Sequence, residues 1–198
     1  MIYRLILSLS FFILLASCQE DKLFLPKPRS FPKISYPDTK IYKDFNENYC
    51  DFGFRYPSYS TIKQDEYFFE EKPVHPCWFD IQSNVFNATM HCSYYPLSGR
   101  KSLDDLVNDA YRLAGKHNVK AEYYEESILN YPGDVKGVLF EIEGDVATPV
   151  QFFLTDSTTH FFRASLYFNS KVNPDSIAPV LDYVMQDIDT LLQSFHWK

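Results

Sequence analysis

The stretch that decides the fold is Val150-Gln151-Phe152-Phe153-Leu154-Thr155, then Asp156-Ser157-Thr158-Thr159-His160, then Phe161-Phe162-Arg163-Ala164-Ser165-Leu166-Tyr167-Phe168. Two aromatic-rich runs flank a connection that is short and polar. Runs rich in aromatic and branched residues favour strands, and a short polar link between two of them indicates an antiparallel hairpin. We therefore expect residues 150–155 and 161–168 to pair directly.

Further strand candidates lie on both sides of this hairpin. Downstream of a helix candidate, residues 119–128 and 135–143 are separated by the turn sequence Asn130-Tyr131-Pro132-Gly133-Asp134. Upstream, alternating polar and aromatic residues predict strands at 51–57, 78–81 and 88–95. The polar stretch 63–72 between the first two of these is expected to be a long loop or hairpin.

Two helices are expected. Ser102 and Asp105 form an acidic variant of the capping box, apolar residues follow at helical spacing to Ala114, and Gly115-Lys116 suits a C-terminus. A second helix begins near Pro174, capped by Asn173 or Asp175. It carries one apolar stripe, which needs a sheet to pack on: Ile177, Val180, Leu181, Val184, Ile188, Leu191, Leu192 and Phe195.

The predicted order is three strands, a helix, four strands and a helix. Grouped strands with segregated helices indicate an α+β fold with an antiparallel sheet of about seven strands and two helices. This order resembles the α-β-α sandwich of PsbP-like domains. One domain, residues 49–198, accounts for it. Acidic residues outnumber basic ones 26 to 19, for a net charge of −7, and no basic cluster is present, so nucleic acid is not an expected partner.

The first residues have the features of an export signal. Arg4 precedes an apolar run that is too short to span a membrane, and small residues follow. Leu15-Ala16-Ser17-Cys18 resembles the bacterial lipobox. That resemblance implies a signal peptide at 1–17 and acylation of Cys18 by chains such as palmitate, since two or more chains hold a protein stably on a membrane. Residues 18–48, rich in proline, are then expected to be a tether.

The anchor predicts a place in the cell envelope. We expect the protein to face the periplasm, on the inner or the outer membrane. The stretch Gln19-Glu20-Asp21-Lys22 also resembles surface-export signals of Bacteroidetes lipoproteins, which leaves surface exposure open.

Three cysteines remain for the exported domain. Cys50 and Cys77 precede neighbouring strand candidates and are the candidate disulfide, whereas Cys92 lies inside a strand run and is expected to be a buried thiol. A metal site formed by His75, His91 and these thiols is the competing interpretation. It lacks C-x-x-C and H-x-x-x-H spacing. We predict no metal, no cofactor and no small-molecule ligand.

The hairpin connection contains the three residue types of a hydrolase triad, Asp156, Ser157 and His160. Triad members usually come from separate parts of a chain, and the Gly-x-Ser-x-Gly motif is absent. In a tight connection, Asp and Ser side chains more often bond their own backbone. We therefore predict no catalytic residue and no enzyme, with a lipid-anchored envelope hydrolase using Ser157 and His160 as the alternative.

Several stretches together resemble GldD, the gliding motility lipoprotein family of Bacteroidetes. Besides the lipobox, they are Cys50 to Pro57, Cys77 to Ile81, Ser93 to Leu97, Asp109 to Leu113 with Lys116-His117 and Lys120-Ala121, Gln151 to Ser157, His160 to Phe162, Leu166 to Phe168, Asn173 to Ser176, Asp187-Ile188 and Trp197-Lys198. The resemblance implies a non-enzymatic part required for gliding and type IX secretion, with other proteins of that machinery as partners. It makes Thr155, Asp156, Ser157 and His160 a family signature turn without assigned chemistry.

Aromatic residues outside the strand runs form two groups. Tyr36, Tyr42 and Phe45 lie in the predicted tether, and Tyr67, Phe68 and Phe69 lie in the predicted loop. A core of strands and helices does not account for them. We expect them to form the surface on which a partner docks.

Overall fold

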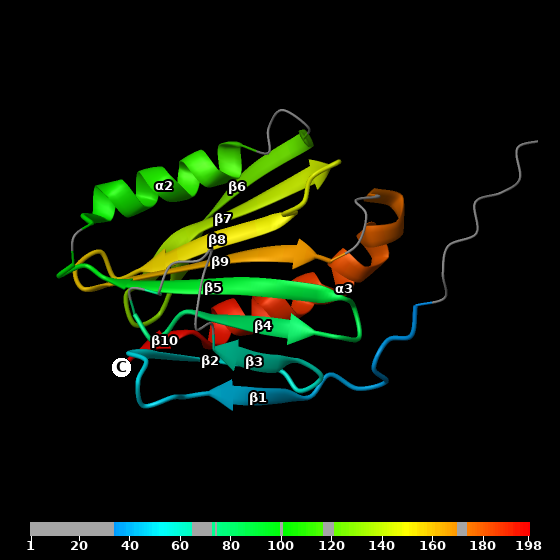
Figure 1. Cartoon of the computed structure of the whole chain (residues 1–198), viewed down its shortest axis with the longest axis horizontal. Coiled ribbons are helices and arrows are strands. Elements are labelled where there is room, and N and C mark those ends of the chain that lie inside the picture. The colour runs from blue at the N-terminus through cyan, green and yellow to red at the C-terminus, as the bar shows by residue number, and fades with distance from the viewer. Residues whose placement is uncertain (1–33, 65–72, 74, 100, 117–120, 170–173) are drawn as a thin grey trace, which may run out of the picture. The chain divides into compact units, whose positions relative to one another are not determined.

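The structure is a computed structural model that describes residues 34–64, 73, 75–99, 101–116, 121–169 and 174–198. Figure 1 labels the strands and helices of these ranges. They are β1 (Tyr42–Phe45), β2 (Phe52–Pro57), β3 (Thr61–Gln64), β4 (Phe79–Ser83), β5 (Ala88–Pro96), α2 (Leu103–Gly115), β6 (Ala121–Tyr131), β7 (Val135–Gly144), β8 (Val150–Thr155), β9 (His160–Phe168), α3 (Pro174–Ser194) and β10 (His196–Trp197).

A seven-stranded antiparallel sheet forms the centre of the fold. Its order is β3-β4-β5-β9-β8-β7-β6, and the predicted hairpin supplies the adjacent strands β8 and β9, with Thr155 opposite Phe161. The predicted α+β class, with two helices and a seven-stranded antiparallel sheet, is confirmed. Because the connection between β8 and β9 is short, the pairing is decided locally, and the other strands are added on either side.

The prediction was wrong about which strands make up the seven. β2 does not join the large sheet but pairs with β1 and the two-residue β10 in a sheet of order β1-β2-β10. Its place at the edge is taken by β3, which pairs with β4 inside a stretch expected to be partly loop. Both sheets are antiparallel, so the class is unaffected.

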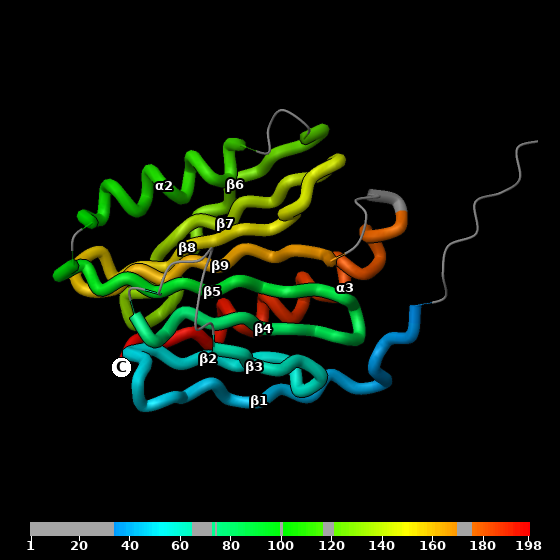
Figure 2. The backbone as a smooth tube through the Cα atoms, in the orientation of Figure 1, coloured from blue at the N-terminus to red at the C-terminus, as the bar shows by residue number. Residues whose placement is uncertain are grey.

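The two faces of the large sheet are covered differently. On one face, α2 packs on β8 and β9 over an apolar cluster that includes Phe140, Phe153 and Phe161. On the other, α3 and the small sheet enclose the larger cluster around Phe52, Phe162 and neighbouring rings. Figure 2 shows the two helices on opposite sides of the sheet. The result is a layered sandwich in which each helix buries its own stripe.

The helix predictions agree with the structure in detail. At α2, the Ser102 hydroxyl accepts from the Asp105 N–H while the Asp105 carboxylate accepts from the Ser102 N–H, so the capping box is present. α3 begins at Pro174 and buries most of the predicted stripe. One polar residue, Asp187, is buried within that stripe at 4% exposure.

The domain begins earlier than the predicted boundary at residue 49. Residues 42–45 of the predicted tether form β1, which pairs with β2. Phe45 is 3% exposed and stacks on Phe54 and Phe79 at ring-centroid distances of 4.7 Å. The proline content that predicted a tether did not show that residues 42–45 pair with β2.

Candidate functional site

The signature turn joins β8 to β9 and is built around the Asp156 carboxylate. Its Oδ1 accepts hydrogen bonds from the backbone N–H groups of Thr158, Thr159 and His160 at 2.8–2.9 Å. The Thr155 hydroxyl donates to the His160 carbonyl at 2.6 Å. Ser157 adopts the left-handed conformation, with φ of 69°. Asp156 therefore closes the turn on its own backbone, as its residue type predicts at such a connection.

These bonds shift the acidity of Asp156. Burial acts to raise its pKa, but the hydrogen bonds from the Thr159, His160 and Thr158 N–H groups and from the Thr158 hydroxyl stabilise the charged form more strongly. The pKa falls from 3.8 to about 2. A carboxylate whose pKa is depressed on folding stabilises the protein above its unfolded-state pKa, and that contribution disappears as the pH falls through the folded value.

Asp156→Asn is therefore expected to be less stable than wild type at pH 7. The difference should shrink as the pH falls from about 4 to about 2, where the wild-type carboxyl is protonated. Urea unfolding at a series of pH values measures it. Ser157→Gly is the control, because it relieves a positive φ in the same turn without changing a titrating group. A stability difference for Asp156→Asn that stays constant down to pH 2 would contradict this account of the turn.

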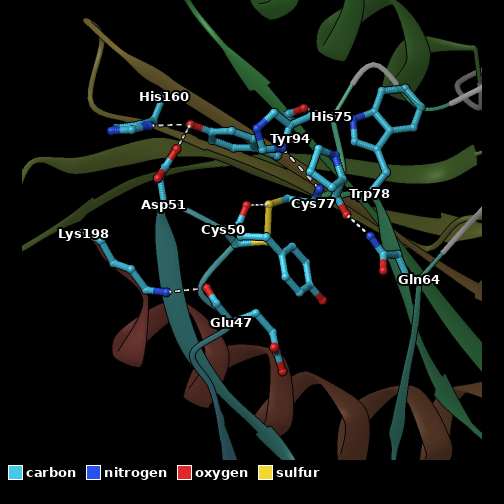
Figure 3. Close-up of a disulfide and its surroundings, with 12 residues drawn as sticks. Glu47, Cys50, Asp51, Gln64, His75, Cys77, Trp78, Tyr94, His160 and Lys198 are labelled. Atoms are coloured by element: carbon cyan, nitrogen blue, oxygen red, sulfur yellow. Dashed lines mark hydrogen bonds between the residues drawn. A yellow bond between two sulfur atoms is a disulfide. The ribbon is translucent and has the colours of Figure 1, made fainter.

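Beside the turn, three side chains from distant segments form one hydrogen-bonded group. The Tyr94 hydroxyl lies 2.7 Å from His160 Nδ1 and donates to Asp51 Oδ2 at 3.3 Å. The His160 ring stacks on Trp197 with centroids 5.0 Å apart. Burial, followed by the charge of Asp51, raises the pKa of Tyr94 well above its usual value, so its hydroxyl stays protonated. Figure 3 shows the group next to the disulfide.

The disulfide joins Cys50, just before β2, to Cys77, just before β4. It links the residue pair just before β2, in the small sheet, to the start of β4, in the large sheet. The bond lies at the end of the domain where Asp51 contacts Tyr94. Several segments that carry the family resemblance meet here: Cys50 to Pro57, Cys77 to Ile81, the turn and Trp197-Lys198. Cys92 is a buried unpaired thiol, and burial raises its pKa, which disfavours the reactive thiolate.

His75 and His91, the two histidines of the competing metal interpretation, have different hydrogen-bond partners. His75 Nδ1 accepts from the Cys77 N–H at 3.2 Å, and its ring meets Tyr94 edge-on. His91 lies 2.6 Å from Asp80 Oδ1. No group of three or more metal-ligating side chains occurs in the part of the chain that the structure describes. The interpretation therefore gains no support.

The triad residues of the alternative function are not arranged as a triad within the described turn. Asp156 is engaged by backbone N–H groups, and His160 Nδ1 is engaged by Tyr94. The structure gives Ser157 a hydrogen bond through its backbone N–H to the Thr155 hydroxyl, at 2.9 Å, rather than one to His160. A nucleophile needs a base within hydrogen-bond reach, and this geometry does not provide one.

The predicted docking aromatics have different outcomes. Tyr67, Phe68 and Phe69 lie outside the described residues, as do the predicted lipidation site Cys18 and the predicted signal peptide. Phe45 belongs to the core, so its prediction was wrong. Tyr42 donates its hydroxyl to Asp187, and Tyr36 packs on Tyr183 with centroids 4.9 Å apart while remaining 38% exposed.

Sequence reasoning missed a pocket of about 350 Å³ on the face of the large sheet that α2 partly covers. Alternate residues of β5 and β9 line it, so finding it would have required knowing how these two strands pair. The lining is polar and aromatic and includes His91, Ser93, Tyr95, Arg163 and Tyr167. Such a mixture is typical of ligand sites, in which a few polar groups fix orientation.

Comparison with known proteins gives one family. The model described as gliding motility lipoprotein GldD matches residues 21–197. Among curated proteins, none matches the chain. Among solved structures, cyanobacterial PsbP (CyanoP) from Synechocystis sp. PCC 6803 is similar at a TM-score of 0.47 and 12% identity, covering 83% of this chain and 98% of that one. Within the described residues, no helix is both long and apolar enough to cross a membrane.

Proposed function

This chain belongs to the GldD family of gliding motility lipoproteins, and on that premise we propose that it acts without catalysis, by binding partner proteins of the gliding and type IX secretion machinery. The family match over residues 21–197 carries the proposal. Family membership gives the protein a role in gliding motility and an anchor in the cell envelope. The link to type IX secretion, acylation of Cys18 and a periplasm-facing domain are parts of the same proposal.

The edge strand β6 supports partner binding and supplies a docking surface. It spans 11 residues at the end of the seven-stranded sheet, and within the described chain only β7 pairs with it. At the opposite edge, β3 has 4 residues. A long open edge offers a row of unpaired backbone groups, which proteins otherwise cover or shorten because another strand can add to it.

The backbone groups that face outward on β6 can be identified from β7. The Ile142 N–H donates to the Pro149 carbonyl, on the side away from β6. Its partner in the register is Tyr124, so the N–H and C=O of Tyr124 also point away from the β6–β7 ladder. By alternation, Glu126, Ile128 and Asn130 also present these groups outward. Ile128 lies among them with 88% of its surface exposed.

Charge identifies the kind of strand that fits. β6 carries Glu122, Glu125 and Glu126, and Glu141 and Glu143 follow on β7. Burial, then the charge of Glu125, raises the pKa of Glu141, as expected where carboxylates crowd one edge. A second copy of the same acidic edge would be repelled. We therefore assign the edge to an extended, basic segment of a partner protein.

The experiment compares variants in a strain that lacks this protein. The deletion is expected to abolish colony spreading and the export of type IX cargo, and wild-type protein should restore both. Ile128→Lys places a like charge against the basic partner and hinders the addition of a strand to β6. The variant should therefore accumulate normally but fail to restore spreading and cargo export. Ile41→Lys is the matched control, since Ile41 is also an exposed isoleucine, at 60%, outside this edge.

The outcomes separate the two levels of the proposal. Normal spreading in the deletion strain would overturn the function itself, and lost spreading with normal cargo export would overturn the secretion link. Full rescue by Ile128→Lys would leave the function standing and remove β6 as its docking surface.

A further inference from the structure

The pocket beside α2 is lined by fixed side chains and is separate from the β6 edge. It opens on the half of the sheet face formed by β5 and β9 and reaches Leu113 near the end of α2. Side chains that alternate along the two strands point into it, since they lie opposite to the core residues Tyr94, Ala164 and Leu166. The pocket is thus formed by the most central strands of the sheet.

Arg163 is the main charged group of this pocket. It lies in the register opposite Ser93 and Phe153. Its Nη2 donates to Gln151 Oε1 and Ser165 Oγ, both at 3.2 Å, and both acceptors are uncharged. Among the described residues, no carboxylate oxygen lies within 4.0 Å of its guanidinium. The cation therefore lacks a counter-ion in the described protein.

The nearby carboxylates already have partners. Asp109 on α2 bonds Lys101 at 2.6 Å and Arg112 at 2.9 Å, and Asp80 bonds His91 at 2.6 Å. Lys101 also lies over the ring of Tyr95, at 5.8 Å from its centroid. Neither carboxylate therefore forms a direct ion pair with Arg163.

An uncompensated cation in a largely buried position is costly, because it loses hydration without gaining an opposite charge. Burial accordingly lowers the pKa of Arg163, although a guanidinium still remains charged. Only Nη2 takes part in the two bonds to Gln151 and Ser165, and Arg163 lines the pocket, so an anion there can accept a charge-assisted hydrogen bond from the rest of the guanidinium.

Aromatic rings supply the other walls. Trp78 and Tyr95 meet edge-on with centroids 5.3 Å apart, and Tyr167 meets His91 in the same way at 5.1 Å. Trp78 also donates its indole N–H to the Tyr94 carbonyl at 2.9 Å, which fixes its orientation. Fixed ring faces beside a guanidinium suit a ligand with a flat or ring-shaped body and one acid group.

We propose that this pocket binds a small ring-bearing carboxylate, with its acid group on the Arg163 guanidinium and its ring against Tyr95 and Trp78. A ligand of this class is either a sugar acid or an aromatic acid. The volume of about 350 Å³ accommodates one ring with its acid group. This activity goes beyond partner binding and does not depend on it.

The test uses the full-length lipoprotein in detergent and two matched pairs of probes. Isothermal titration compares glucuronate with glucose and benzoate with benzamide, up to about 10 mM, where weak binding is still measurable. At least one acid should bind, and its neutral counterpart should not. Arg163→Gln should weaken binding of that acid roughly tenfold or more, since a charge-assisted bond is lost. Arg163→Lys should recover part of it, since it keeps the positive charge without the planar guanidinium.

Arg55→Gln is the control, because it makes the same change of charge on β2, in the other sheet. Thermal unfolding of each variant separates binding from folding, and Arg163→Lys serves if Arg163→Gln does not fold. Whichever acid binds identifies the source of the ligand. Equal binding of acid and neutral probe, equal binding by wild type and both Arg163 variants, or no binding by either acid would overturn the proposal.

Discussion

Replacing Cys50 and Cys77 together by serine is expected to lower the free energy of unfolding by about 3–4 kcal/mol. The two cysteines are 27 residues apart, and the chain-entropy model gives this value for a loop of that size because the crosslink restricts the unfolded chain. Each kcal/mol shifts the midpoint of a domain of this size by about 2–4 °C, so the melting temperature should fall by roughly 10 °C.

The disulfide is expected to matter for position as well as for stability. It holds the segment before β2 next to β4, and the segment carries Asp51, which reaches Tyr94 beside the signature turn. Differential scanning calorimetry with and without reductant measures the stability effect. Reductant should lower the wild-type midpoint to that of the double variant and leave the double variant unchanged. Cys92→Ala is the control for the loss of a thiol that forms no disulfide. Equal midpoints for wild type and double variant in oxidising buffer would contradict the prediction.

Features whose partners lie close in sequence were predictable. The β8–β9 hairpin follows from two aromatic runs and a short polar link, and the capping box of α2 follows from Ser102 and Asp105. In both cases the deciding hydrogen bonds connect residues a few positions apart, so local residue types are sufficient. The same holds for the turn, where the Asp156 oxygens take the neighbouring N–H groups.

Features decided by distant partners were not predictable. β10 has only two residues, His196 and Trp197, too few for a periodic pattern, yet it pairs with β2 in the small sheet. Phe45 was expected at a docking surface because it lies in a proline-rich segment. Its burial depends on Phe54 and Phe79, which only the tertiary fold brings to it.

The pocket at Arg163 was missed for a related reason. Alternation along β9 predicts that Arg163, Ser165 and Tyr167 share one face, but the sequence does not say which face α2 leaves uncovered. The prediction of no small-molecule ligand therefore rested on the absence of a motif. Whether Arg163 has a carboxylate partner can be judged only when the positions of the surrounding carboxylates are known.

Asp187 shows the same limit in the core. It lies one residue before Ile188 in the apolar stripe of α3 and is 4% exposed. Lys40 Nζ lies 3.0 Å from its Oδ1, the Tyr42 hydroxyl donates to the same oxygen at 2.8 Å, and the Tyr59 hydroxyl donates to Oδ2. Burial, followed by the bond to Asp187, raises the pKa of Tyr59 far above its usual range, so this phenol remains a donor. The carboxylate thus joins the first described segment of the domain to its last helix.

Asp187→Ala is expected to cost about 3–5 kcal/mol, because it removes the buried carboxylate that neutralises Lys40 and accepts from two tyrosine hydroxyls. Urea unfolding measures the loss, and Asp189→Ala is the matched control, since Asp189 is an exposed aspartate on the same helix. The additional variants Lys40→Met and Lys40→Met/Asp187→Ala complete a double-mutant cycle. Removing Lys40 should relieve part of the cost of Asp187→Ala, because the stranded cation is then gone. Additive effects in the cycle, or an Asp187→Ala variant as stable as Asp189→Ala, would show that this carboxylate does not hold the N-terminal segment to α3.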